Sequence, residues 1–128
     1  MNPVQGINKP PDFAGRTQEF AIRVIGVCAA LPETYLGQTL GHQLLRAGTS
    51  VGAHYAEANH SRSRADFLSK IDVARQEMQE TIYWMKLILG AKLLEPRRLD
   101  PLLSEAHELL AILITMSNNA RKHAEAKH

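Results

Sequence analysis

Apolar side chains between Ser63 and Leu89 recur at alternating steps of three and four residues, which places them in one stripe along a helix. No proline or glycine interrupts this segment, and Gly90 suits its end. Ser63 followed by Asp66 predicts an N-cap with an acidic residue at the third helical position. A helix of this length extends roughly 40 Å and needs partners of similar length to cover its stripe. The stripe consists of Phe67, Ile71, Ala74, Met78, Ile82, Met85 and Leu89.

Three further segments have helical periodicity, and they cover residues 13–30, 37–58 and 100–122. Asp12 suits the N-cap of the first, and Pro32 ends it because proline moves the preceding residue out of the α region. The fourth helix begins either at Asp100-Pro101 or at Glu95-Pro96. We favour Asp100, since Pro101 would otherwise remove a hydrogen bond from the helix interior.

Glycines lie within the second of these helices, at Gly41, Gly48 and Gly52. Each interior glycine lowers helix stability by about 1 kcal/mol relative to alanine. Their spacing is helical, so they do not form the consecutive loop amides of a phosphate-binding turn. We therefore interpret them as positions where another backbone comes close.

Four long amphipathic segments, no strand-like alternation and short connections predict an all-α fold. We expect an antiparallel, up-down-up-down four-helix bundle over residues 13–123, with tails at residues 1–12 and 124–128. The first and fourth helices have apolar residues beside their main stripes. They either bury a second face against another subunit or form a broad face within a single bundle.

The chain has 128 residues, a net charge of +2 and a pI of about 8.9. This charge is only weak support for a nucleic-acid partner. No apolar run reaches the 18 or so residues of a membrane span, and the N-terminus lacks the apolar core of a secretory signal. We expect a cytoplasmic protein that does not bind membranes.

Basic residues form two clusters next to the predicted connections, with additional arginines on the first helix. The connections near residues 60 and 95 lie at opposite ends of an antiparallel bundle, so the two clusters cannot form one patch in a monomer. Together they hold phosphates in an oligomer, or they are solvated charges that keep the protein in solution. The candidate nucleic-acid-binding residues are Arg16, Arg23, Arg62, Arg64, Arg97 and Arg98.

The second and third helices carry a two-segment signature that resembles the family of the 23S rRNA intervening-sequence protein, also labelled S23. In the second helix the matching residues are Arg46, Ser50, Val51, Ala53, Ala56 and Glu57. In the third they are Ser63, Phe67, Ala74, Glu77, Glu80, Thr81, Tyr83 and Trp84. The chain departs from the family pattern at His54, Tyr55 and Ala58, so a site at the end of the second helix is altered here.

The resemblance implies a four-helix bundle that assembles as a pentameric ring, and it implies no catalytic residues. A similar bundle is the accessory protein of diversity-generating retroelements, which binds nucleic acid and a reverse transcriptase. We therefore expect a non-enzymatic homo-oligomer that binds structured RNA or DNA, or a nucleic-acid enzyme such as a reverse transcriptase. The alternative is a structural or protein-interaction module without nucleic-acid binding.

Metal and nucleophile chemistry have weak support in the sequence. His54 and Glu57 form a His-x-x-Glu pair only once, whereas di-iron bundles use Glu-x-x-His twice, so we assign no metal or other cofactor. We expect hydrogen bonds between helices among Arg46, Glu57, Arg75 and His54 instead. Cys28 is interpreted as a small buried hydrophobe, and Tyr83 and Trp84 as core or interface packing.

Overall fold

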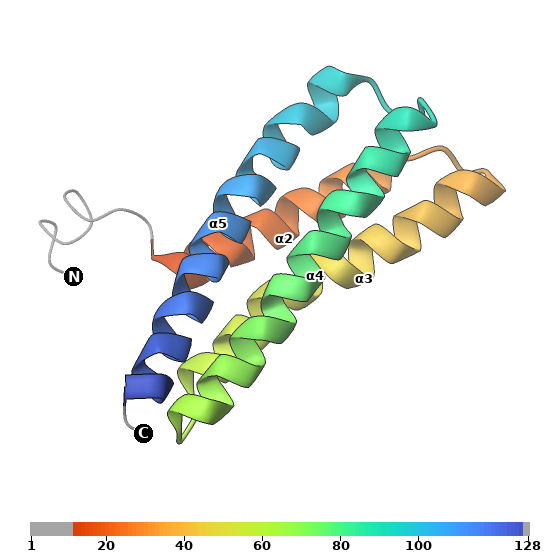
Figure 1. Ribbon diagram of the computed structural model, residues 1–128. Helices are drawn as coiled ribbons and strands as arrows, with labels where there is room; N and C mark the ends of the chain where they lie inside the picture. Colours follow the sequence, from red (N-terminus) through yellow and green to blue (C-terminus); the bar gives the residue numbers. More distant parts are fainter. Residues whose placement is uncertain (1–11, 127–128) are drawn as a thin grey trace, which may run out of the picture.

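The computed structural model describes residues 12–126, and of residues 124–126 it describes the backbone only. This part of the chain contains four helices and no strand, which confirms the predicted all-α class. Figure 1 shows the helices side by side as one bundle. The predicted tails at residues 1–11 and 127–128 lie outside the described residues. The helices are α2 (Phe13–Ala30), α3 (Tyr35–Asn59), α4 (Arg64–Gly90) and α5 (Pro96–Ala126).

Side-chain caps begin α3 and α4. The Ser63 Oγ accepts a hydrogen bond of 3.0 Å from the Asp66 N–H, as the sequence pattern predicts. The Thr34 Oγ1 accepts one of 3.1 Å from the Gly37 N–H, so α3 begins two residues before the predicted start at Gly37. Each of these oxygens satisfies one of the N–H groups that a helix start leaves without a partner inside the helix.

The start of α5 differs from our preferred assignment at Asp100. The helix begins at Pro96, the alternative start, and Pro101 lies inside it. Proline removes one hydrogen bond there, but starting earlier brings Leu99 into the helix, where its side chain is fully buried. Burying a leucine is worth about 1.5 to 3 kcal/mol, which is enough to offset the missing bond. At its other end α5 continues to Ala126, past the predicted end at residue 122.

Each helix packs on the next one in the chain, and the last helix also packs on the first. α3 packs on α2 and α4, and α5 packs on α4 and α2. Residues distant in sequence meet between α3 and α4. Arg46 meets Glu77 and Glu80, whereas Ala58 and Phe67 line one hollow near the turn. The fully buried core side chains include Phe20, Leu44, Val51, Ile71, Met78, Met85, Ile88, Leu99, Leu109 and Leu113.

The glycines of α3 face α2 at close range. A Cβ atom at Gly48 would lie 2.8 and 2.9 Å from the two methyl groups of Val24. At Gly52 it would lie 3.1 Å from the Thr17 Oγ1 and 3.6 Å from the carbonyl carbon of Thr17. The interpretation that another backbone comes close therefore holds at Gly52, whereas at Gly41 and Gly48 the nearest atoms belong to the side chains of Leu31 and Val24.

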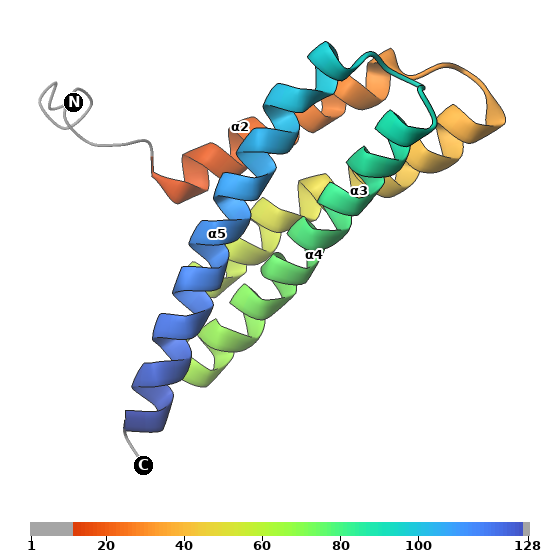
Figure 2. The ribbon, with the colours of Figure 1, turned by 45° about the horizontal axis from the view of Figure 1, so that its top comes forward.

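Among the described residues, the shortest helix does not extend over one end of the bundle. α2 has 18 residues, whereas α3, α4 and α5 have 25, 27 and 31. Its first residue, Phe13, packs edge-on against Tyr55 with 4.7 Å between ring centroids. α3 continues beyond that level towards the turn with α4, and Figures 1 and 2 show only α3, α4 and α5 at this end. The fold thus has a four-helix part and a three-helix end.

Candidate nucleic-acid interface

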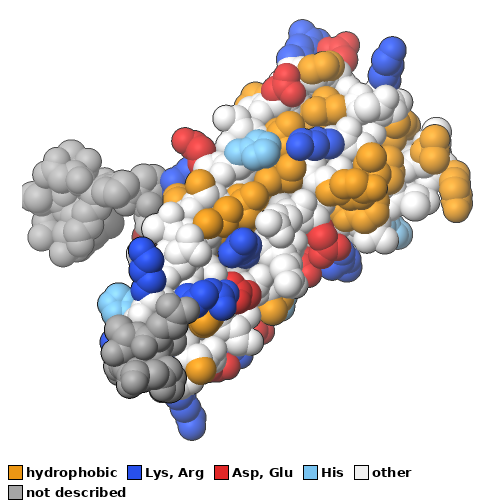
Figure 3. Space-filling view, viewed as in Figure 1, with side chains coloured by type: hydrophobic (Ala, Val, Ile, Leu, Met, Phe, Trp, Pro, Cys, Tyr) orange, Lys and Arg blue, Asp and Glu red, His pale blue; other side chains and the backbone are white. Residues whose placement is uncertain are grey.

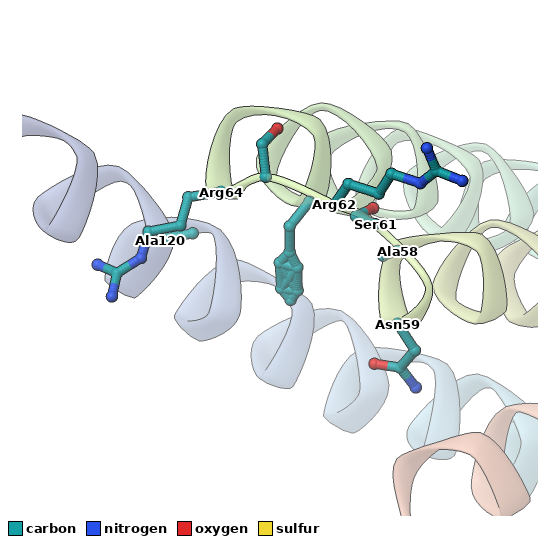
Figure 4. Close-up of a pocket in the computed structure, with 8 residues that line it drawn as sticks. Ala58, Asn59, Ser61, Arg62, Arg64 and Ala120 are labelled. Atoms are coloured by element: carbon teal, nitrogen blue, oxygen red, sulfur yellow. The ribbon is translucent and has the colours of Figure 1, made fainter.

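Arg62 and Arg64 lie on either side of Ser63, the N-cap residue of α4, at the three-helix end. Both side chains are exposed, and neither forms an ion pair with any of residues 12–123. They line a hollow of about 370 Å³ together with Asn59 and Phe67. In Figure 4 the two guanidinium groups extend to opposite sides of this hollow. Two positive charges therefore lie here without carboxylate partners among residues 12–123.

Arg16, in contrast, is bound within the bundle. Its Nη2 and Nε donate hydrogen bonds of 2.7 and 3.2 Å to the two carboxylate oxygens of Glu105 on α5. Glu108 adds a contact of 3.5 Å. The hydrogen bond from Arg16 holds the pKa of Glu105 below its ordinary value, and the same bond raises the pKa of Arg16. Arg16 therefore links α2 to α5 through an ion pair and presents little free charge to a ligand.

The remaining candidates lie near the opposite end of the bundle. Arg23 of α2 and Arg98 of α5 line one hollow of about 300 Å³, so the fold brings these two predicted residues together. Arg97 instead contacts Glu95, with 2.7 Å between its Nε and a carboxylate oxygen. Figures 1 and 2 place the α3–α4 and α4–α5 connections at opposite ends, so the six candidates do not form one patch in a single subunit.

The signature residue Arg46 connects α3 to α4. Its Nη1 lies 3.3 Å from a carboxylate oxygen of Glu77, and its Nη2 lies 3.1 Å from one of Glu80. The Ser50 hydroxyl donates to the Arg46 carbonyl at 2.6 Å. Our expectation that Arg46 would bond to Glu57 is wrong, because the guanidinium group turns to α4 and Glu57 is exposed. Arg46, Glu77 and Glu80 thus join α3 to α4, whereas the Ser50 hydrogen bond lies within α3.

Two aromatic signature residues differ in burial along α4. Tyr83 is 54% exposed, whereas Trp84 is partly buried against the core, and their rings meet edge to face at 5.1 Å. The indole N–H of Trp84 is buried, and it has no hydrogen-bond partner among the described residues. Phe67, a third aromatic of this helix, is half-buried and lines the hollow beside Arg62 and Arg64. Trp84 thus contributes packing, while Tyr83 and Phe67 retain accessible surface.

The departures from the family pattern lie near the end of α3. Ala58, buried, forms part of the hollow lining, and Tyr55 packs on Phe13 one turn earlier. His54 lies 3.7 Å from Glu57 on its own helix. The predicted change at the end of α3 therefore falls beside the free arginines.

Several residues of this end were absent from the sequence-based site. Met116, Asn119, Ala120 and His123 of α5 line a second hollow of about 330 Å³, which shares Arg64, Phe67 and Ala120 with the first. Helix length was the available signal. The first predicted helix is shorter than the third, so one end of the bundle had to lack its cover.

The chemistry of these helices is that of charge and packing. No three His, Cys, Asp or Glu side chains of the described residues approach closely enough to hold a metal ion. The Cys28 thiol donates to the Gly41 carbonyl at 3.5 Å, and burial raises its pKa to about 11. The thiol is therefore protonated at neutral pH, and a thiolate nucleophile is scarce.

Residues 12–115 match the model of the 23S rRNA-intervening sequence protein family. The chain belongs to this family. A crystal structure of a protein of unknown function from the S23 ribosomal protein family of Bacteroides thetaiotaomicron has a similar fold. It superposes with a TM-score of 0.78 at 29% identity, over 83% of this chain and 98% of that one. Among curated proteins, none matches this sequence.

This member of the 23S rRNA-intervening sequence protein family has its free arginines inside the matched range. The part of α5 that faces them, including Ala120 and His123, follows that range. In the described part of the chain, no helix combines the length and hydropathy needed to span a bilayer.

Proposed function

We propose that the chain binds nucleic acid, or an enzyme that acts on nucleic acid, through basic surfaces of an oligomer, without catalysis of its own and in the cytoplasm. The oligomer is a pentameric ring of antiparallel, up-down-up-down bundles. The observation that carries the proposal is the pair Arg62 and Arg64, which are exposed and lack carboxylate partners among the described residues.

Arginines that already contact a carboxylate contribute little to the external field. Arg16, Arg46, Arg97 and Arg121 each have an acidic partner within 3.3 Å. Arg62 and Arg64 sit at the start of α4, where the helix dipole adds partial positive charge. The two guanidinium groups extend to opposite sides of the hollow, so separate phosphates of one strand can each meet an arginine without first displacing an acid.

Two apolar patches on different helices support assembly into a ring. On α2, Ile22 and Ile25 are 54% and 51% exposed, and on α4, Tyr83 and Leu87 are exposed. Figure 3 shows hydrophobic side chains gathered over the upper half of α4. In the described bundle α2 packs on α3 and α5 but not on α4, so the two patches face different directions. Two different patches suit a head-to-tail contact, which closes into a ring when the rotation permits.

Ring assembly increases the positive charge that a nucleic acid meets. The formal charge of +2 per chain becomes about +10 in a pentamer, and each arginine pair is repeated five times. A long or folded nucleic acid can then engage several pairs at once, which multiplies its affinity. Arg23 and Arg98 form a second basic position near the other end. The family name refers to ribosomal RNA, which makes a structured RNA the first ligand to test.

The same apolar patches favour a second candidate, a protein-interaction module without nucleic-acid binding. Exposed isoleucine, tyrosine and leucine side chains can be covered by another protein as well as by a second copy of the chain. Nucleic-acid affinity measured on the intact oligomer separates the two candidates.

The test is binding of a fluorescent structured RNA to the purified oligomer, whose mass is measured first, between about 50 and 200 mM salt. We compare the wild type with Arg62→Gln/Arg64→Gln and with the control Lys92→Gln/Arg97→Gln. The control removes the same charge at the other end, from an exposed lysine and an arginine already paired with Glu95.

We expect Arg62→Gln/Arg64→Gln to bind at least about tenfold more weakly at low salt, because two guanidinium groups no longer hold phosphates. Its slope of log K against log salt should become shallower by about 0.9 for each phosphate that it no longer binds. The control stays within about threefold of the wild type. Equal decreases in both variants would show that only net charge matters. An intact oligomer without affinity at about 50 mM salt would contradict the proposal and support the interaction module.

A further inference from the structure

The two hollows at the three-helix end lie next to each other, because they share Arg64, Phe67 and Ala120 in their linings. We call this surface the turn groove. Its two parts measure about 370 and 330 Å³ and are open to solvent. It exists because α2 begins at the level of Tyr55 and does not extend over the last turn of α3.

The lining of the turn groove combines an apolar floor with a polar rim. Phe67, Ala58, Ala120 and Met116 supply apolar surface. Two side-chain amides belong to the lining, Asn59 from the end of α3 and Asn119 from α5. An amide offers both a donor and an acceptor, which is what the edge of a nucleobase requires.

The free arginines flank this floor and do not converge on it. Figure 4 shows Arg64 extending along α5 near Ala120 and Arg62 extending to the other side of the hollow. A single inorganic phosphate would be held better by converging guanidinium groups. Two separated positive charges beside an apolar floor instead match a strand, in which phosphates flank each base.

We propose that the turn groove receives an unpaired nucleotide of a single-stranded or loop segment of RNA or DNA. The base lies on Phe67, and the phosphates before and after it contact Arg62 and Arg64. The inference rests on the proposed nucleic-acid binding and names the form that is bound. A paired duplex keeps its bases stacked inside, so it reaches the arginines but not the floor.

The experiment compares two fluorescent ligands with equal numbers of phosphates, a single-stranded oligonucleotide and a fully paired duplex, on the intact oligomer. Phe67→Leu keeps an apolar side chain of similar size and removes the aromatic face. Phe13→Leu is the matched control, because Phe13 packs on Tyr55 outside the groove lining. Circular dichroism verifies that each variant is folded.

We expect Phe67→Leu to weaken single-strand binding about tenfold and to leave duplex binding within about twofold, since stacking on an aromatic ring carries much of single-strand affinity. Phe13→Leu leaves both within about twofold. Ala120→Leu is a second variant, because it fills the groove from α5 without removing a core side chain. It gives the same selective decrease if Phe67→Leu does not fold.

Wild-type single-strand affinity in both groove variants would overturn the groove assignment. If Arg62→Gln/Arg64→Gln still weakened binding in that case, the proposed function would stand and only the nucleotide site would be wrong. A preference of the wild type for the duplex over the single strand would also overturn the groove assignment. Absence of binding to either ligand at about 50 mM salt would remove the proposed function, and the groove assignment with it.

Discussion

The start of α2 at Phe13 divides the bundle into two regions whose arginines have different partners. Where α2 is present, Arg16 lies against Glu105, and the glycines of α3 lie close to α2. Beyond Phe13, where α2 is absent, Arg62 and Arg64 have no acidic partner among the described residues. The covered region pairs Arg16 with Glu105 and packs α2 on α3, although Arg23 and Arg98 stay exposed there, whereas at the other end Arg62 and Arg64 lie beside accessible apolar surface.

The difference in arginine pairing arises from the acidic side chains on the neighbouring helix. α5 presents Glu105 and Glu108 to Arg16, so that arginine is neutralised within the bundle. Near the turn the acidic residues contact their own helices, since Asp66 lies 3.8 Å from Lys70 and Glu57 lies 3.7 Å from His54. Arg16 is therefore a weaker candidate for binding an external anion than Arg62 and Arg64, whereas Arg23 and Arg98 remain exposed candidates in the covered region.

The largest decrease in stability is expected from a substitution where α2 and α3 are closest. Gly48→Val places a branched side chain against the Val24 methyl groups, which a Cβ atom alone would approach to 2.8 Å. Overpacking of this kind lowers the free energy of unfolding by about 3 kcal/mol. Urea unfolding followed by circular dichroism measures the change, with equal protein concentrations because assembly adds to apparent stability.

Gly26→Ala provides the matched control on α2. A Cβ atom there has no neighbour within 4 Å, so the variant gains helix propensity without a clash. We expect it to raise the free energy of unfolding by up to about 1 kcal/mol. An equal decrease in both glycine variants would mean that packing between α2 and α3 does not determine the stability of the covered region.

A smaller decrease in stability is expected when the Arg16–Glu105 ion pair is broken. The two side chains are 26% and 19% exposed. Glu105→Gln removes the charge and keeps the shape, and it should lower the free energy of unfolding by about 1 to 2 kcal/mol at pH 7. The hydrogen bond from Arg16 lowers the pKa of Glu105 in the folded state. The stabilisation is therefore present above the unfolded pKa of about 4.3 and disappears as pH falls through the folded value.

Urea unfolding of the wild type and Glu105→Gln between pH 7 and pH 3 tests this dependence. The difference between them should be full near neutrality and should shrink below about pH 4.3. A difference that stays constant down to pH 3 would show that the variant acts through packing. Glu95→Gln, at the exposed Arg97 contact, is the control and should change stability by less than about 0.5 kcal/mol.

Much of the fold follows from local pattern, because periodicity and caps act over a few residues. The bounds of α2 and the Ser63 cap of α4 agree with the prediction. The start of α5 does not, since burial of Leu99 is a tertiary effect that outweighs the local rule about Pro101. Local rules fail where long-range packing supplies more free energy than the local conflict removes.

The candidate site was less predictable, because charge pairing depends on contacts between distant residues. Arg16 and Glu105 are far apart in sequence, and nothing local indicates that they bind each other. The position of Arg62 and Arg64 at a connection follows from the sequence, but the α5 side of the groove, including Ala120, depends on how far that helix continues. Unequal helix lengths are the sequence feature that indicates an uncovered end.

The smallest effect on stability is expected at the arginines most exposed to a ligand. Arg64 is the first residue of α4, where a positive charge opposes the helix dipole. Arg62→Gln/Arg64→Gln should therefore leave the free energy of unfolding unchanged or raise it by about 0.3 kcal/mol at low ionic strength, and the gain should vanish in high salt. Urea unfolding at two salt concentrations measures both values. A decrease above about 1 kcal/mol would assign these arginines a structural role like that of Arg16. An unchanged or higher stability, combined with weaker nucleic-acid binding, would mean that the uncovered end retains its charge for binding and not for folding.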